Sequence, residues 1–270
     1  MLFRKIQDDI ETYLKLGSNK VLIIDGARQV GKTFIIRHVG KALFQNYIEV
    51  NMLEDAIGER LFQHVKSVDD FYLRLSILAG NKMKEKKNTL VFLDEIQAYP
   101  QLLTLLKFLK DDDKYAYIAS GSLLGVTLAK TTSIPMGSIE VKHMYPLDFE
   151  EFLLANGFGM SSINTLREMF IKEVSLDEPV HNKMMDMLKK YLLVGGLPDA
   201  VNSFLKDANI IKVRNIQQEI HGFYALDASK YGSDKKLKIR RVFDMVPSNL
   251  ENRKKRIVVK EIENKKGKRY

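Results

Sequence analysis

The strongest constraint on the fold is an eight-residue segment near the N-terminus, Gly26-Ala-Arg-Gln-Val-Gly-Lys-Thr33, which fits the pattern G-x-x-x-x-G-K-[ST]. An apolar run of strand length precedes it at residues 20–25, and residues 34–44 follow with apolar side chains at helical spacing. Glycine adopts backbone angles that other residues avoid, so Gly26 and Gly31 allow the loop to curl with its N–H groups pointing inward. The segment therefore predicts a phosphate-binding loop between a strand and a helix.

The residue types of the loop also predict how it would hold a nucleotide. The free N–H groups and the dipole of the following helix add to the positive field of the loop. We expect the Lys32 ammonium to reach the β- and γ-phosphates and the Thr33 hydroxyl to coordinate Mg²⁺. The residues expected to bind the nucleotide here are Gly26, Ala27, Arg28, Gln29, Val30, Gly31, Lys32, Thr33 and Phe34.

A second motif stands at the end of an apolar run, residues 89–94. An acid at the tip of a buried strand beside a phosphate loop is the Walker B arrangement. We expect Asp94 to hold the Mg²⁺ and Glu95 to orient the attacking water. Taken alone, the same residues describe a core strand that ends in two solvated acids. The acidic pair favours hydrolysis over phosphoryl transfer to a small molecule, and the lack of an Asn-Lys-x-Asp motif favours ATP over GTP.

The intervening residues predict the fold class. Apparent strands at 46–50 and 115–119 alternate with apparent helices near 54–64, 69–79 and 101–110, and another amphipathic helix runs to about Leu16. This alternation predicts an α/β fold with a parallel sheet flanked by helices. Where such a sheet inserts a strand between the two motif strands, a polar residue at its end senses the γ-phosphate. Ser120 is expected in the catalytic set with Lys32 and Glu95, and Ser122 as a nucleotide contact, unless Ser122 caps the next helix.

The chain resembles the prokaryotic AAA-type ATPases that carry a C-terminal domain of unknown function. The resemblance implies a P-loop NTPase domain at residues 1–155, a smaller, mainly helical lid or linker domain at 156–250, and a basic tail at 251–270 that begins an incomplete C-terminal domain. Members of the family continue beyond this point, so the chain looks C-terminally truncated. The segments that carry the resemblance are Gly26–Thr33, Leu90–Gln97, Tyr117–Ser122, Tyr145–Phe152, Tyr191–Pro198, Asp227–Tyr231 and Val246–Leu250.

Two of these segments also predict local structure. Asp148 and Glu151 have the spacing of a capping box that opens a helix. The segment from Gly195 to Pro198 is expected to end one helix and begin the next, because proline suits the first turn.

The chain departs from the family in its arginines. Gly137-Ser138 occupies the place where relatives often have Gly-Arg, and no arginine occurs between Arg74 and Arg167. An arginine finger adds several powers of ten to hydrolysis, and lysine lacks its planar fork. We therefore expect slow basal hydrolysis, with self-association and a finger from Arg74 or Arg167 of another copy as the alternative.

Composition excludes several other classes. The 270 residues contain no cysteine and no apolar run long enough to span a bilayer, so we expect a cytoplasmic protein without disulfides or membrane contact. The net charge is +9, of which residues 251–270 carry +6. Such a basic end binds nucleic-acid backbones in some proteins and is simply a solvated end in others.

These observations leave two principal hypotheses. In the first, the protein is an ATPase that uses Mg²⁺ and ATP binding and hydrolysis as a switch or motor, with ATP and ADP as its ligands. In the second, it is a nucleic-acid-binding module that binds DNA through its basic end, and ATP is bound but hydrolysed weakly or not at all. The intact Asp94-Glu95 pair favours the first, and the missing arginine favours the second.

Overall fold

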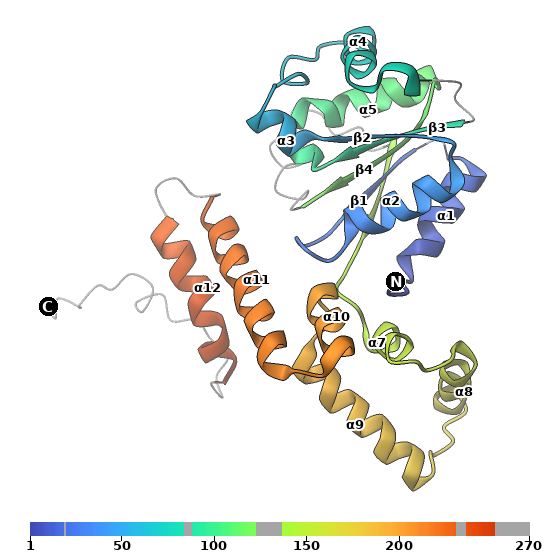
Figure 1. The fold of residues 1–270 in the computed structure, drawn as a ribbon, viewed down its shortest axis with the longest axis vertical. Coiled ribbons are helices and arrows are strands. Elements are labelled where there is room, and N and C mark those ends of the chain that lie inside the picture. Colours follow the sequence, from blue (N-terminus) through green and yellow to red (C-terminus); the bar gives the residue numbers. More distant parts are fainter. Residues whose placement is uncertain (19, 84–87, 123–136, 231–235, 252–270) are drawn as a thin grey trace, which may run out of the picture.

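The computed structural model describes residues 1–18, 20–83, 88–122, 137–230 and 236–251. A parallel sheet with helices on both faces forms one part of the molecule, and a cluster of helices forms the other (Figure 1). This architecture confirms the predicted α/β fold with a following helical region. The tail at 251–270 lies almost entirely outside the described residues, so the expectations for it stay predictions.

The sheet has five strands in the order β2-β3-β4-β1-β5, and all the neighbouring pairs are parallel. The strands are β1 (Val21–Asp25), β2 (Asn46–Asn51), β3 (Thr89–Asp94), β4 (Ala116–Gly121) and β5 (Ile139–His143). β4 lies between the two motif strands β1 and β3, the arrangement on which the expected roles of Ser120 and Ser122 depend. Sequence reasoning missed β5, an edge strand that is only half-buried and alternates apolar and polar residues over a short span.

Five helices and two 3-10 turns belong to the sheet part of the described chain. They are α1 (Ile6–Leu16), α2 (Lys32–Leu43), α3 (Met52–Ile57), α4 (Val68–Ala79), η1 (Gly80–Lys82), η3 (Ile96–Ala98) and α5 (Pro100–Asp112). The predicted helix near 54–64 was wrong in length, since α3 ends at Ile57. The Asp55 carboxylate accepts hydrogen bonds from the backbone N–H groups of Leu61 and Phe62, which stabilises a loop in place of further helix.

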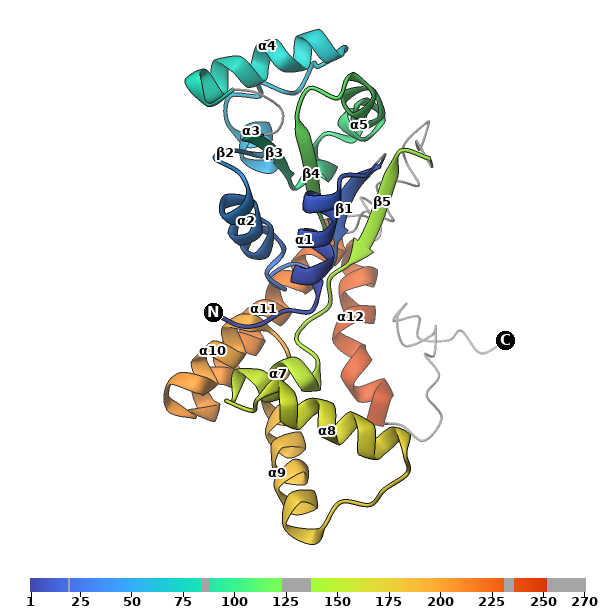
Figure 2. The same cartoon turned by 90° about the vertical axis from the view of Figure 1, so that its right-hand side faces the viewer.

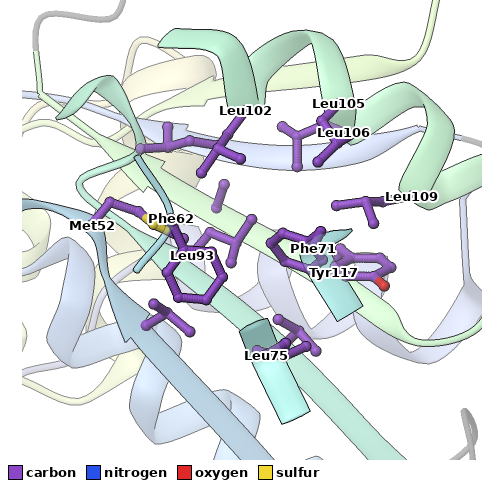
Figure 3. Close-up of a cluster of buried hydrophobic side chains, with 14 of the residues drawn as sticks. Met52, Phe62, Phe71, Leu75, Leu93, Leu102, Leu105, Leu106, Leu109 and Tyr117 are labelled. Carbon is purple, nitrogen blue, oxygen red and sulfur yellow. The ribbon is translucent and has the colours of Figure 1, made fainter. Parts of the chain in front are cut away.

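Side chains alternate strictly across the central strands, and this alternation decides what each face packs against. Val21, Ile23 and the matching residues of β3 and β4 belong to a cluster with residues of α3, α4 and α5. Figure 3 labels Leu93 of β3 and Tyr117 of β4 within this cluster. Leu22, Ile24 and Phe92 point into a second cluster with α1 and α2. Both faces of the central strands β1, β3 and β4 are buried, as expected of a parallel sheet. Their carboxyl ends are therefore the places on these strands where polar side chains can act.

The helical region forms a third cluster, which includes Phe152, Met187, Val201 and Val213. Its helices are α7 (Phe149–Ala155), α8 (Met160–Ile171), α9 (Glu178–Val194), α10 (Pro198–Asp207), α11 (Ile210–Lys230) and α12 (Lys236–Glu251). The capping box of Asp148 and Glu151 is confirmed at the start of α7, and α10 begins at Pro198 as predicted. The domain boundaries at 155 and 250 stay predictions.

The helical region lies beside the sheet part, and α11 extends toward it (Figure 2). The Tyr224 hydroxyl of α11 donates to the Arg28 carbonyl at 2.6 Å, so this helix touches the phosphate loop directly. No helix in the described ranges has both the length and the apolar character needed to cross a bilayer.

The turn between α9 and α10 approaches the backbone before α7 closely at Gly196, so we predict that Gly196→Ala destabilises the protein. The Leu147 N–H donates to the Gly196 carbonyl at 2.7 Å, and a Cβ on Gly196 would lie 2.1 Å from the Leu147 carbonyl oxygen. Since backbone atoms cannot rotate away, we expect a loss of about 2–3 kcal/mol in thermal or chemical unfolding. Gly222→Ala is the matched control because a Cβ there meets open space within α11. That control should be neutral or stabilising by up to about 1 kcal/mol, and equal stability of the two variants would contradict this packing.

Candidate nucleotide site

The alternation of side chains brings the polar ends of three strands together on the α2 side of the sheet. Asp94 continues the parity of Leu90 and Phe92, and Ser120 continues that of Ile118. Ser120 pairs in register with Ile24 of β1, two residues before Gly26. The strand ends therefore place a carboxylate and a hydroxyl against the start of α2.

The phosphate loop between β1 and α2 needs its glycines. Gly26 has φ +155°, and a Cβ there would lie 2.3 Å from the Met144 carbonyl oxygen. Gly31 caps α2 with φ +98°, and Gln29 lies in the left-handed region with φ +61°. The curled conformation predicted from the sequence is thus present, and it is fixed in part by the chain that follows β5.

Lys32 is buried at the first position of α2. Its Nζ donates to the Gly26 carbonyl at 2.9 Å and to the Ala27 carbonyl at 2.8 Å, so the ammonium closes the loop on itself. Burial lowers the pKa of Lys32, and the carboxylates of Glu95, Asp94 and Asp25 oppose that shift. An anion in the loop would supply this buried cation with a counterion.

The Asp94 carboxylate lies at the centre of the site. The Thr33 hydroxyl donates to its Oδ2 at 2.9 Å, while the Ser120 hydroxyl and the Glu95 backbone N–H donate to its Oδ1. Asp94 is 3% exposed, and burial raises the pKa of its carboxyl, although the bonds from Ser120 and Thr33 oppose this. One carboxylate thus joins β3, β4 and α2.

Glu95 follows immediately in the left-handed conformation, with φ 52° and ψ 44°, and η3 begins after it. Its Oε2 accepts hydrogen bonds from the Gln97 side-chain amide and from the Ser122 hydroxyl, the latter at 3.2 Å. Strained conformations of this kind concentrate at functional sites. The two serines contact different acids. The Ser120 hydroxyl donates to the Asp94 carboxylate, and the Ser122 hydroxyl donates to the Glu95 carboxylate.

A cavity of about 1050 Å³ opens over the loop. Its walls come from the N-terminal segment, the loop, the start of α10 and the last turns of α11, and they include Arg28, Gln29, Gly31, Lys32, Thr33, Phe34 and Glu95 among the predicted residues. An adjoining polar cavity of about 480 Å³ includes Asp94 and shares Thr33, Arg37 and Glu95 with the first. The structure thus brings the two motifs together. Five predicted residues line neither cavity: Gly26, Ala27, Val30, Ser120 and Ser122. The Val30 side chain is fully buried in the core.

Sequence reasoning missed Arg4, which braces the loop and lines the cavity above it. Its guanidinium donates to the carbonyl oxygens of Val30, at 2.8 Å, and of Tyr145, and it pairs with the Glu151 carboxylate at 3.2 Å. Both side chains of the ion pair are nearly buried. Its partners lie up to 147 residues away, so no local pattern could have indicated the role.

The two arginines considered as fingers are both engaged within the chain. Arg74 pairs with Asp70 one turn earlier in α4. Arg167 of α8 pairs with Glu150, and that hydrogen bond lowers the pKa of the Glu150 carboxyl to about 2. Neither lines the two cavities over the loop. Within the described residues, no cluster of three or more His, Cys, Asp or Glu side chains could hold a metal ion without other ligands.

A family model described as an AAA domain matches residues 18–153, half of the chain. The chain belongs to the AAA-domain family. The matched segment contains the whole sheet with both motifs, so membership of this ATPase family supports nucleotide binding at the loop. A second model, described as a domain of unknown function, matches residues 185–270. No curated protein sequence matches this AAA protein.

Solved structures resemble this AAA protein in fold at low sequence identity. The Walker-type ATPase of Pyrococcus abyssi is 14% identical, with a TM-score of 0.51 over 88% of this chain and 78% of the other. The Orc1 protein of Aeropyrum pernix, in complex with DNA, is 14% identical, with a TM-score of 0.44 over 98% and 82%. AMPPCP-bound DnaA from Aquifex aeolicus is 12% identical, with a TM-score of 0.42 over 94% and 80%. The first of these likenesses supports the fold alone.

We predict that Arg4→Ala costs about 3–5 kcal/mol of stability, because removing one partner leaves the buried Glu151 carboxylate without its counterion. Arg240→Ala is the matched control, since its ion pair with Asp244 is exposed and 4.0 Å long. That control should cost less than about 1 kcal/mol. Chemical denaturation measures both, and an Arg4→Ala protein as stable as the control would contradict a bracing role.

Proposed function

We propose that this AAA protein binds ATP with Mg²⁺ in the cavity over the phosphate loop and hydrolyses it, using the cycle as a switch or motor. The observation that carries the proposal is the short distance, 2.9 Å, between the Thr33 hydroxyl and the Asp94 carboxylate. A hydroxyl and a carboxylate side by side, next to a buried ammonium and a curled glycine loop, fit a phosphate-bound magnesium ion.

The phosphate loop, Lys32, Thr33, Asp94 and Ser120 each have a role in this proposal. The inward N–H groups of the loop bind the β-phosphate, and the Lys32 ammonium exchanges the carbonyls of Gly26 and Ala27 for phosphate oxygens. Thr33 and Asp94 hold Mg²⁺, which neutralises charge on the phosphates when bound. Ser120 keeps the Asp94 carboxylate oriented from β4.

The rest of the cavity suits a purine nucleoside. Met144 and Pro198 lie close to Gly31, with side-chain atoms 3.6 and 3.8 Å from the position of a Cβ there. Met1 and Leu2 contribute further apolar wall. Apolar walls beside a phosphate site favour a base in that space, and the sequence favours adenine.

Hydrolysis is assigned to Glu95. Its carboxylate borders both cavities, beside the hydroxyl and the acid that would hold the metal. In this position Glu95 orients a water for attack on the γ-phosphate and accepts its proton. Charge that develops on the phosphate is met by Lys32 and by the loop N–H groups.

Coupling to the helical region follows from shared walls. Pro198 and Asp199 of α10 and Tyr224 of α11 border the same cavity as the loop. The Tyr224 hydroxyl bonds the Arg28 carbonyl, so filling the cavity acts directly on α11. A ligand shifts a conformational equilibrium by its differential affinity for the two states. In this proposal, the contacts of α10 and α11 with the cavity make the affinity for ATP depend on the position of these helices.

Nucleic-acid binding with weak hydrolysis stays the second candidate, favoured by the net charge of +6 on residues 251–270. DNA as partner, self-association and a cytoplasmic location are likewise proposals. The two candidate functions separate in a steady-state ATPase assay with and without DNA, run at several salt concentrations. DNA binding without ATP turnover would favour the second candidate.

We predict that Lys32→Ala weakens ATP binding at least about tenfold, because charge-assisted bonds to phosphate contribute more than about 1.4 kcal/mol. Lys41→Ala, in the exposed last turn of the same helix, should bind like the parent. Isothermal titration calorimetry with ATP and Mg²⁺ measures both, and equal affinities for Lys32→Ala and the parent would reject the phosphate cradle.

We predict that Glu95→Gln retains ATP binding and lowers turnover at least about a hundredfold, since glutamine keeps the size of the side chain but cannot accept the proton of water. Glu59→Gln, at an exposed site beyond α3, is the control and should turn over ATP like the parent. Phosphate release under saturating ATP is the measurement. A Glu95→Gln protein as active as the parent would exclude Glu95 as the base.

A further inference from the structure

The side chain of Gln97 connects Glu95, the proposed base after β3, with Ser122 after β4. Its Oε1 accepts the Ser122 backbone N–H at 3.2 Å. Its Nε2 donates to the Ser122 hydroxyl, also at 3.2 Å, and to Oε2 of Glu95. The Gln97 amide therefore makes two hydrogen bonds to Ser122, just after β4, and one to Glu95, just after β3.

The orientation of this amide is fixed by chemistry. A backbone N–H only donates and an ionised carboxylate only accepts, so the oxygen of Gln97 must face Ser122 N–H and the nitrogen must face Glu95. The Ser122 hydroxyl accepts from Gln97 and donates to Glu95, at 3.2 Å each. The three side chains form a closed triangle in which every bond has a defined direction.

Contacts outside the triangle also hold the backbone that carries Gln97. The η3 turn places the fully buried Ile96 in the core, and the Tyr99 hydroxyl donates to the Asp55 carboxylate at 2.7 Å. The Ala98 N–H donates back to the Glu95 carbonyl at 3.0 Å. These contacts hold the turn after Glu95, whose left-handed backbone conformation costs about 1–3 kcal/mol.

We propose that Gln97 is a positioning residue, which holds the Glu95 carboxylate at the end of β4 during ATP hydrolysis; this inference rests on the proposed function. The Ser122 hydroxyl has a single proton, which it gives to Glu95 in the structure. A γ-phosphate that accepts this proton takes the donor away from Glu95. Gln97 is the donor that stays, so the carboxylate keeps its place when the site is loaded.

Gln97→Met tests the inference because it keeps the length of the side chain and removes the amide. We expect kcat for ATP to fall about ten- to a hundredfold, the effect of a slightly misplaced catalytic group. KM and the ATP dissociation constant should stay within about threefold of the parent, since Gln97 is proposed to act on Glu95 alone. Gln97→Glu, a second variant of nearly equal size, places an acceptor against Glu95 and should lose as much.

Gln101→Met is the matched control. Gln101 is exposed in the first turn of α5 and donates to the Gln63 carbonyl, away from both cavities, so its kcat should equal that of the parent. In the Glu95→Gln background, single-turnover hydrolysis should fall no further when Gln97→Met is added, because the group that Gln97 positions is already gone.

Each outcome decides between specific alternatives. A parent-like kcat in Gln97→Met, a loss of ATP affinity that matches the loss of rate, or a further loss in the Glu95→Gln background would overturn the positioning role while the proposed ATPase activity stands. A parent protein that binds ATP without hydrolysing it would overturn the assignment of Glu95 and this inference together.

Discussion

The buried carboxylate of Asp94 is the interaction on which the site depends. An acid with 3% exposure at the end of an apolar strand is costly unless its oxygens are hydrogen-bonded. Donors come from the Thr33 hydroxyl of α2, the Ser120 hydroxyl of β4 and the Glu95 backbone. Because these lie on different elements, the carboxylate fixes the start of α2, the end of β4 and the turn after β3 relative to one another. The same oxygens that satisfy these donors are those a metal ion would use.

The phosphate loop is also held by residues that belong to neither motif. Arg4 donates to the Val30 carbonyl, and the Tyr224 hydroxyl of the helical region donates to the Arg28 carbonyl. Arg4 in turn pairs with Glu151, which closes the capping box of α7. In the proposed function, a change in the loop on nucleotide binding would reach α7 through Arg4 and α11 through Tyr224. This network is the physical basis of the proposed switch.

The sequence predicted those features that depend on local patterns. The glycine loop between β1 and α2, the acids after β3 and the capping box at Asp148 each have a spacing that chemistry requires. It did not predict β5, because an edge strand that is half solvated carries a weak alternation over five residues. It could not predict the contact of Arg4 with the phosphate loop or the hydrogen bonds of Gln97 to Ser122, because both depend on the fold that brings distant residues together. The length of α3 was missed because the Asp55 carboxylate competes with the helix for backbone donors.

Calorimetric titration of the protein with ATP, in Mg²⁺ and then in EDTA, tests the central claim most directly. If Lys32, Thr33 and Asp94 form a nucleotide cradle, the protein binds one ATP per chain, and chelating the metal weakens that binding because Thr33 and Asp94 then lack the ion that joins them to the phosphates. ATP binding of equal strength in Mg²⁺ and EDTA would contradict the metal assignment. No binding of ATP at millimolar concentration would contradict the account as a whole.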